Sequence, residues 1–297
     1  MTRIAKRKFG SITKRKAFFL VPAGIYLGLM SVYPLAILIK MSMSRVTETT
    51  INQKWPSAGL LNYKEGIKSG QVTGALNRTL MFVTIVTLIG LIMGFFSAIA
   101  LKNSGKFSTF LMAGMVFIWA LPPVINGSVW KFLLSQNGLI NTILHQFGMT
   151  SVPFLYNAHV ALLFISLVNS WAVIPFNALV FRAAILSIPE EILEASKLDG
   201  VNAWQEIKYI TFPFLKPTGF VLTILTVVYA FRSFDFIYVM TFGGPGTATN
   251  TLPYLSYNQS FAQYNFGLGS STAILTLLIV FSLGIFYSRT LSKEESI

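Results

Sequence analysis

The sequence has 297 residues, of which 54% are hydrophobic and only 11% are charged, with a formal net charge of +13. A soluble domain would carry about a quarter charged residues, so the composition excludes an ordinary soluble protein and predicts a helical protein that crosses a membrane several times. Cysteine is absent and histidine occurs twice, which excludes disulfides, thiol nucleophiles and cysteine metal sites and leaves little material for a metal centre.

The chain begins with a basic segment, residues 1–16, in which seven residues are Lys or Arg. A long apolar run at 17–39 follows it. This run is too long for the apolar region of a signal peptide, and no small-residue cleavage pattern comes after it, so we expect an uncleaved first span. Basic residues that flank apolar spans are typical of membrane orientation rather than of nucleic-acid binding.

Six apolar runs have the length of about 20 residues that a spanning helix needs. They cover residues 17–39, 80–101, 110–134, 159–181, 215–240 and 272–291. The third run contains Leu121-Pro122-Pro123, which must kink or break the helix. Broken backbone in a span often lies beside a cavity, and a purely structural kink is the alternative. No linker divides the runs, so we expect a single membrane domain over residues 17–297.

The Lys and Arg residues are divided unequally between the two sides that six spans would define. With the N-terminus inside, the inner segments hold fifteen and the outer segments five, and the outer loops 135–158 and 241–271 hold none. The basic excess marks the cytoplasmic side. We therefore expect both termini in the cytoplasm and residues 182–214 to form a cytoplasmic loop.

Acidic residues are concentrated in that loop. Five of the ten acids of the chain fall within seventeen positions, namely Glu190, Glu191, Glu194, Asp199 and Glu206. The cytoplasmic leaflet is anionic and attracts basic segments, so an acidic loop favours a protein partner over lipid. A loop that is merely solvated is the alternative.

Local signals in the loop predict two short amphipathic helices joined by a turn. Ser187-Ile188-Pro189-Glu190 has the pattern of a capping box, with proline in the first turn. Gly200 suits the position just past a helix end, where a positive φ is common. Asn202 can cap the second helix, with Gln205 three residues later.

The same loop resembles the signature of ATP-binding-cassette (ABC) importer permeases, which reads E-A-A, three residues, G, nine residues, I-x-L-P. The chain has Glu194-Ala195-Ser196, Gly200 and Ile210-Thr211-Phe212-Pro213 at this spacing, with Ser for the second Ala and Phe for Leu. In that family the loop is the coupling helix that contacts the ATPase subunit. The resemblance implies this role for Glu190, Glu191, Glu194, Ala195, Ser196, Asp199, Gly200, Ile210 and Pro213.

Other segments are similar to the carbohydrate, maltose-permease-like branch of the family. Phe234-Asp235 followed by Thr241-Phe242-Gly243-Gly244-Pro245 resembles its FD…T-x-GGP segment, and residues 59–63 and 75–79 resemble the approach to its second span. The resemblance covers the six-helix core. It implies an all-α integral membrane fold, the six-helix transmembrane domain of a type I ABC importer with cytoplasmic coupling helices.

Polar residues in the fourth run are candidates for a sugar site, because a sugar needs hydrogen-bonding side chains in a wet cavity. Asn169-Ser170-Trp171 with Pro175 resembles the N-x-W…P pattern of the family. The resemblance implies that Asn169, Ala172 and Val173 lie at the sugar site. Polar contacts between helices are the alternative explanation of the asparagine.

In the fifth run Thr226, Tyr229 and Ser233 recur at i, i+3 and i+7 and should share one helix face, with Ala230 beside them. These positions resemble the sugar-contacting face of the related helix, and ordinary packing is the alternative. Arg232 and Asp235 stand at i and i+3, so they could form an intramembrane ion pair. Such an Arg could favour an anionic substrate, or the pair could be structural.

No nucleotide-binding motif G-x-x-x-x-G-K-[ST] is present, so we expect a transport subunit that is not an enzyme and binds no cofactor. The resemblance implies a second related permease, two ATPase subunits that carry ATP and Mg²⁺, an extracytoplasmic solute-binding protein and a sugar, with no nucleic acid. It also implies a location in a bacterial inner membrane. The alternatives are a permease for glycerol-3-phosphate or another anion, an ion-coupled secondary transporter, and a membrane scaffold.

Overall fold

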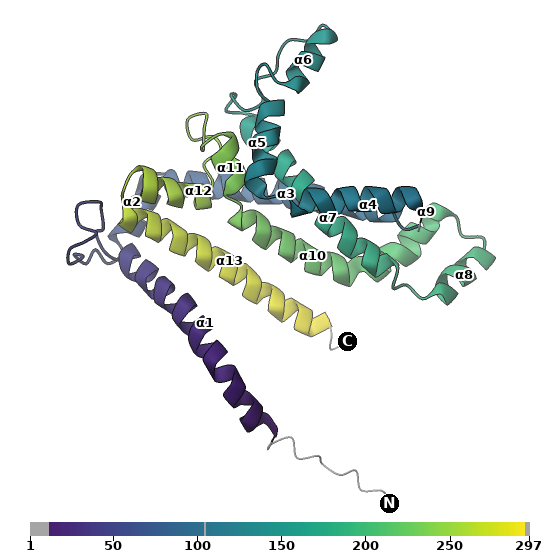
Figure 1. Cartoon of the computed structure of the whole chain (residues 1–297), viewed down its shortest axis with the longest axis horizontal. Coiled ribbons are helices and arrows are strands. Elements are labelled where there is room, and N and C mark those ends of the chain that lie inside the picture. Colours follow the sequence, from purple (N-terminus) through teal and green to yellow (C-terminus); the bar gives the residue numbers. More distant parts are fainter. Residues whose placement is uncertain (1–11, 104, 295–297) are drawn as a thin grey trace, which may run out of the picture.

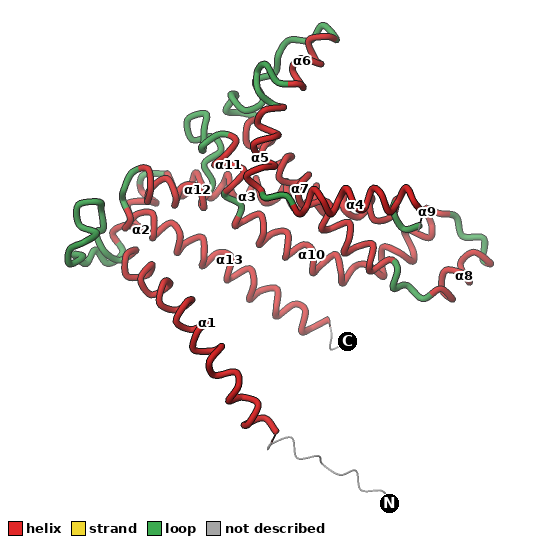
Figure 2. Tube along the Cα trace, viewed as in Figure 1, coloured by secondary structure: helices red, strands yellow, loops and turns green. Residues whose placement is uncertain are grey.

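The computed structural model of the chain describes residues 12–103 and 105–294, and this part of the protein is almost entirely helical (Figure 1 and Figure 2). Strand pairing in the described residues is limited to two isolated bridges, Ser44 with Ser57 and Thr47 with Asn265. The predicted all-helical fold is confirmed. Most of the basic segment 1–16 lies outside the described residues.

Five helices of the described chain are long and apolar enough to cross a membrane, or up to six if the bent pair α4–α5 forms one span. The longer helices are α1 (Ile12–Ser42), α3 (Gln71–Ala100), α7 (Ala161–Ile185), α10 (Phe212–Arg232) and α13 (Phe266–Glu294). The shorter ones are α2 (Leu61–Lys68), α4 (Lys106–Ala120), α5 (Pro123–Leu133), α6 (Leu139–Gln146), α8 (Glu190–Leu198), α9 (Ala203–Glu206), α11 (Asp235–Met240) and α12 (Leu252–Tyr257), with π-helical turns at Ile207–Thr211 and Asn258–Ala262.

The centre of the fold is the long contact between α3 and α7, which other helices cover (Figure 1). Helix α10 packs on both, α4 packs on α7, and α13 packs on α12 and α10. Helix α1 contacts α13 near α2 and diverges from it, extending away from the other helices (Figure 1). Buried apolar side chains fill the interior, with Phe82, Ile165, Phe231 and Phe236 at its centre. Much of the apolar patterning of the sequence therefore serves helix-to-helix packing.

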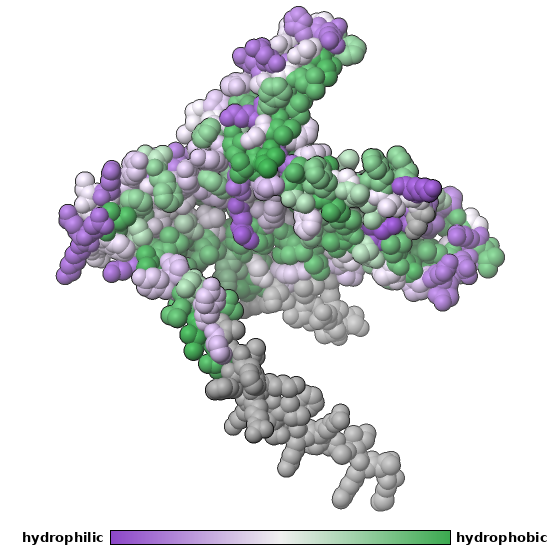
Figure 3. Space-filling model, viewed as in Figure 1, coloured by the Kyte–Doolittle hydropathy of each residue, from purple (hydrophilic) through white to green (hydrophobic). Residues whose placement is uncertain are grey.

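The outer surface of the bundle is apolar over much of its length. Large apolar side chains such as Leu88, Ile92 and Phe96 on α3 and Phe110 and Phe117 on α4 are exposed. Hydrophilic side chains gather at the two ends of the long helices and at the tip beyond α6, as Figure 3 shows. An apolar surface between polar ends is the pattern expected of helices that face lipid.

The predicted break in the third span is confirmed. Helices α4 and α5 are separated by Leu121 and Pro122 and are bent by 102° with respect to each other. Leu121 has a ψ of 135°, the extended conformation that a following proline imposes. Pro123 then begins α5, where its missing N–H has no cost.

The helix at the predicted fifth span, 215–240, has different bounds at both ends. Helix α10 ends at Arg232, Ser233 is extended with φ −67° and ψ 112°, and a new helix begins at Asp235. At the other end the helical path runs without a break from Ala203. Helix α3 likewise begins at Gln71, before the start of the second predicted span at residue 80.

The loop 182–214 contains the two predicted short helices, α8 and α9, with Gly200 between them at φ +73°. Asn202 and Gln205 form the predicted capping box, in which each side chain accepts a hydrogen bond of 2.9 Å from the backbone N–H of the other. The predicted capping role of Ser187 is wrong. Its hydroxyl donates to the carbonyl of Ala184 in the last turn of α7, and Pro189 occupies the N-cap position.

Candidate functional site

A cavity of about 330 Å³ opens at the bend between α4 and α5, where these helices meet α7, α10 and α11. The residues that line it are Trp119, Leu121, Pro123, Asn126, Ala172, Val173, Phe176, Leu225, Thr226, Tyr229 and Phe236. None of these side chains carries a charge. The helix break that the two prolines cause therefore borders a cavity, and the cavity suits a neutral ligand.

Four of the predicted substrate residues line this cavity: Ala172 and Val173 from α7, and Thr226 and Tyr229 from α10. The other three, Asn169, Ala230 and Ser233, do not line it and are buried, with exposed fractions of 0%, 2% and 8%. Asn169 Nδ2 donates a 3.0 Å hydrogen bond to Ser233 Oγ. This bond links α7 to the break after α10.

Buried polar groups next to the cavity retain hydrogen-bonding capacity. Thr226 Oγ1 donates to Asn177 Oδ1 over 3.3 Å. Asn177 Nδ2 and Asn169 Oδ1 have no hydrogen-bond partner among the described residues. An unpaired polar group in a low-dielectric site is costly, so a ligand hydroxyl that reached either atom would gain a favourable contact.

Aromatic side chains form much of the cavity wall. Trp119 from α4 stacks on Phe176 from α7, with ring centroids 5.7 Å apart and planes inclined by 24°. Tyr229 is 37% exposed beside them. Trp119, Phe176 and Asn126 were not among the predicted substrate residues. The signal that could have located Trp119 is its position two residues before the Leu-Pro-Pro break.

The predicted pair of Arg232 and Asp235 is not formed. The two residues lie on different helices, because α10 ends at Arg232 and α11 begins at Asp235. Over residues 12–103 and 105–294 the ion pair found is Lys102 with Glu206, and Arg232 is exposed and outside the cavity lining. A spacing of i, i+3 brings two side chains together only on a continuous helix. No group of His, Asp and Glu side chains in the described chain could hold a metal ion.

The second candidate site is the α8–α9 surface, which we define as residues Glu190–Glu206 at the end of the bundle (Figure 1). A shallow groove of about 450 Å³ crosses it, lined by Glu191, Ile192, Ala195, Ser196, Asp199, Val201 and Ile210. Five of the predicted coupling residues are among them. Glu190 and Glu194 are exposed on α8, Gly200 forms the turn, and Pro213 lies in the first turn of α10.

Apolar side chains are exposed on the same surface. Leu198 is 90% exposed, Trp204 65% and Ile192 45%. Large apolar groups beside acidic ones at the polar end of a membrane protein indicate a protein contact. The inner face of the loop, by contrast, is anchored, because Ile188 is buried in a cluster with Phe181, Ile185 and Leu215.

Known proteins of similar sequence are transport permeases. The sequence model of the family described as "Binding-protein-dependent transport system inner membrane component" matches residues 87–291. The diacetylchitobiose uptake system permease protein of Streptomyces coelicolor is 30% identical over 80% of this chain and 74% of its own length. The trehalose/maltose transport system permease protein of Thermococcus litoralis is 32% identical over 82% of each chain.

Among solved structures, a chain of a bacterial alginate ABC transporter, in complex with an alginate pentasaccharide-bound periplasmic protein, superposes with a TM-score of 0.80. The match covers 95% of this chain and 96% of that chain, at 20% sequence identity. At this identity the likeness supports the fold. The helices described above therefore have the arrangement of an importer transmembrane domain.

Proposed function

The chain belongs to the family of binding-protein-dependent transport system inner membrane components, and from this premise we propose that it is one permease subunit of an ATP-driven sugar importer. It would form half of the translocation pathway, and a second related permease would form the other half. The observation that carries the proposal is the α8–α9 surface, where acidic and large apolar side chains are exposed on a loop that is anchored to the bundle.

The expected partners follow from the missing nucleotide-binding motif and from the exposed α8–α9 surface. It has no nucleotide-binding motif, so ATP and Mg²⁺ would be bound by two separate ATPase subunits that contact the α8–α9 surface. The excess of Lys and Arg near this surface favours a cytoplasmic location for it and for both termini. A solute-binding protein would deliver the sugar on the opposite side of the membrane, which we take to be a bacterial cytoplasmic membrane.

Transport would proceed by alternation between two conformations, inward-open and outward-open. ATP binding would favour one conformation through the α8–α9 surface, and the loaded binding protein would favour the same conformation from outside. Sugar would then enter the cavity beside Tyr229 and Thr226. Hydrolysis of ATP would allow return to the inward-open state.

A neutral sugar is favoured over glycerol-3-phosphate or another anion. No charged residue is among the described residues that line the cavity, and Arg232 lies outside it. An anion would need a cationic group or several donors at the site. The same observation disfavours an ion-coupled carrier, which would need titratable groups along its path. Similarity to permeases for diacetylchitobiose and for trehalose/maltose supports the choice of an oligosaccharide.

The proposal is tested by purification of the tagged chain from its native membranes in mild detergent, with identification of the co-purifying chains by mass. We expect a second permease and an ATPase with a nucleotide-binding motif, and a solute-binding protein after mild cross-linking. Recovery of the chain alone, or only with itself, would contradict the proposal.

The aromatic wall should contribute to sugar binding. Replacing Trp119 with alanine is expected to lower the uptake rate at limiting sugar about 2- to 10-fold, because an aromatic contact contributes about 0.5–1.5 kcal/mol. Phe117→Ala is the matched control, since Phe117 lies two residues away on α4, is 66% exposed and does not line the cavity. Equal uptake by the two variants, measured with radiolabelled sugar at equal expression, would remove Trp119 from the site.

A further inference from the structure

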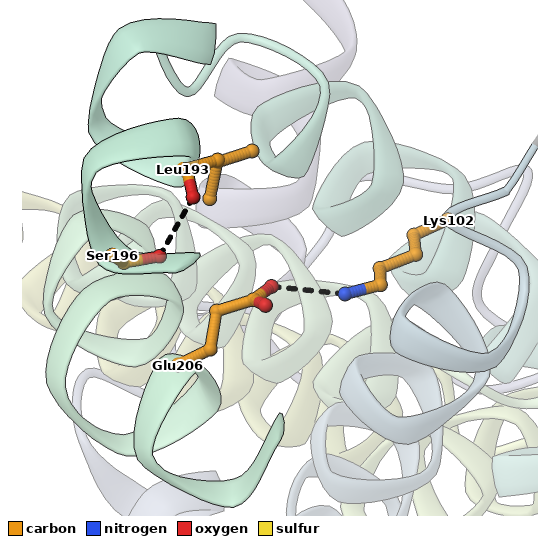
Figure 4. A network of polar contacts seen from close by, with 4 residues as sticks. All are labelled: Lys102, Leu193, Ser196 and Glu206. Atoms are coloured by element: carbon orange, nitrogen blue, oxygen red, sulfur yellow. Dashed lines mark hydrogen bonds and ion pairs between the residues drawn. The ribbon is translucent and has the colours of Figure 1, made fainter. Parts of the chain in front are cut away.

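The turn between α3 and α4 is joined to the α8–α9 surface by one ion pair. Lys102 Nζ lies 2.9 Å from Glu206 Oε1, and the side chains are 37% and 19% exposed. Figure 4 shows Glu206 reaching from α9 towards Lys102, beside the Ser196–Leu193 hydrogen bond within α8. Among the described residues no other ion pair occurs. Glu206 therefore differs from the other acids of the loop, which are exposed and form no ion pair there.

The same turn is also tied to the bundle. Arg182 Nε at the end of α7 donates a 2.7 Å hydrogen bond to the carbonyl oxygen of Leu101. Ser108 Oγ on α4 donates to this oxygen over 3.2 Å. The turn thus holds the first residues of α4 against both α7 and the α8–α9 surface.

Helix α4 connects this turn directly to the cavity. It has 15 residues, so it is about 22 Å long. It buries none of its own residues and packs against α7, which leaves it little resistance to displacement. Trp119 lies in its last turn and Leu121 directly follows its end. Both residues line the cavity. A displacement at the first residue of α4 would therefore reach the wall of the cavity through one rigid helix.

We infer that Lys102 is a positioning residue for energy coupling, because its ion pair with Glu206 makes α4 follow the α8–α9 surface when an ATPase moves that surface. Trp119 then changes position in the cavity wall as the loop moves. This inference rests on the proposed function. The ion pair lies near the surface and is only partly buried, and such a pair contributes little to folding stability, so its loss should affect the transmission of movement rather than the fold.

Other basic residues nearby do not offer this connection. Lys208 lies over the ring of Tyr209, with its Nζ 4.9 Å from the ring centroid. Lys197 and Lys106 form no ion pair in the described part of the chain. Lys106 begins α4 and is exposed, so it provides a matched control for a change of charge next to the same turn.

The test uses the complete transporter, purified with its partners and reconstituted in proteoliposomes with its binding protein and sugar. The measured quantity is the number of sugar molecules imported per ATP hydrolysed. We expect Lys102→Glu and Glu206→Lys each to lower this ratio at least 5-fold, and the double exchange to restore it to within 2-fold of the wild type. Lys106→Glu and Lys102→Arg should keep the ratio of the wild type.

A second readout follows the helix itself. The chain has no cysteine, so Phe117→Cys gives this chain a single labelling site on α4, two residues before Trp119. A fluorescent label there should report an ATP-dependent change that Glu206→Lys abolishes and the double exchange restores. Should the single variants fail to assemble, Lys102→Gln and Glu206→Gln remove the pair without reversing a charge.

The outcomes separate the inference from the proposed function. The role of the ion pair would be overturned if the single variants kept the wild-type ratio of sugar to ATP and the wild-type label signal. It would also be overturned if the double exchange failed to restore them. ATP-driven uptake would stand in either case. Absence of ATP-driven uptake in the wild-type complex would overturn the proposed function, and the inference with it.

Discussion

Replacing Gly200 with proline is expected to abolish ATP-driven uptake, with a loss of at least 100-fold, while the chain still inserts in the membrane. Gly200 has φ +73°, whereas proline requires a φ near about −65°. The substitution also removes the N–H of residue 200, which donates to the carbonyl of Lys197 over 3.1 Å. Because the N–H of Val201 closes the same turn onto Ser196, α8 and α9 would lose their relative orientation.

Two further substitutions, Gly200→Asn and Gly200→Ala, distinguish disruption of the turn from removal of the glycine itself. Asparagine adopts the left-handed region more readily than other non-glycine residues, so Gly200→Asn should retain most of the uptake. Gly200→Ala should give an uptake rate between those of the asparagine and proline variants. The space around the position is open, since a Cβ added at Gly200 would meet no atom within 4 Å, so backbone conformation rather than crowding sets this order. Wild-type uptake and binding-protein-stimulated ATPase activity in Gly200→Pro would exclude the loop as the coupling element.

The parts of the loop that could be predicted well from the sequence are those in which one residue has one strong conformational preference. Gly200 follows the end of α8, and Asn202 caps α9 together with Gln205, as expected from local spacing. Ser187 matches a capping pattern equally well, but the prediction that it caps α8 is wrong. Its hydroxyl donates a hydrogen bond to the preceding helix instead. A serine near a helix end can bond in either direction, and only the packed structure shows which.

The face that lines the cavity was predicted in part for a similar reason. A helical repeat correctly placed Thr226 and Tyr229 on one wall of the cavity. The repeat could not be extended to Ser233 or Arg232–Asp235, because α10 ends at Arg232. Neither glycine nor proline occurs at positions 233–234 to signal the break. The stacked pair Trp119–Phe176 joins two helices distant in sequence, so no local pattern contains it.

The close approach of α3 and α7 leads to the second large expected effect, that of Gly94→Ala. A Cβ at Gly94 would lie 2.6 Å from the Cβ of Asn177 and 3.3 Å from the backbone nitrogen of Ala178. Neither atom is at the end of a flexible side chain, so the two helices must separate. Overpacking of this kind costs about 1–3 kcal/mol. We expect the thermal midpoint of the detergent-solubilised chain to fall by about 2 to 12 °C.

Uptake should fall with stability in Gly94→Ala, because displacement of Asn177 also displaces its hydrogen-bond donor Thr226 at the cavity. Gly114→Ala is the matched control. Gly114 lies in α4, where an added Cβ meets no atom within 4 Å, and replacing a helical glycine with alanine there should leave the midpoint unchanged or raise it. If both variants melted at the wild-type temperature, the two helices would tolerate a wider separation than the structure has, and the cavity wall could not depend on their contact.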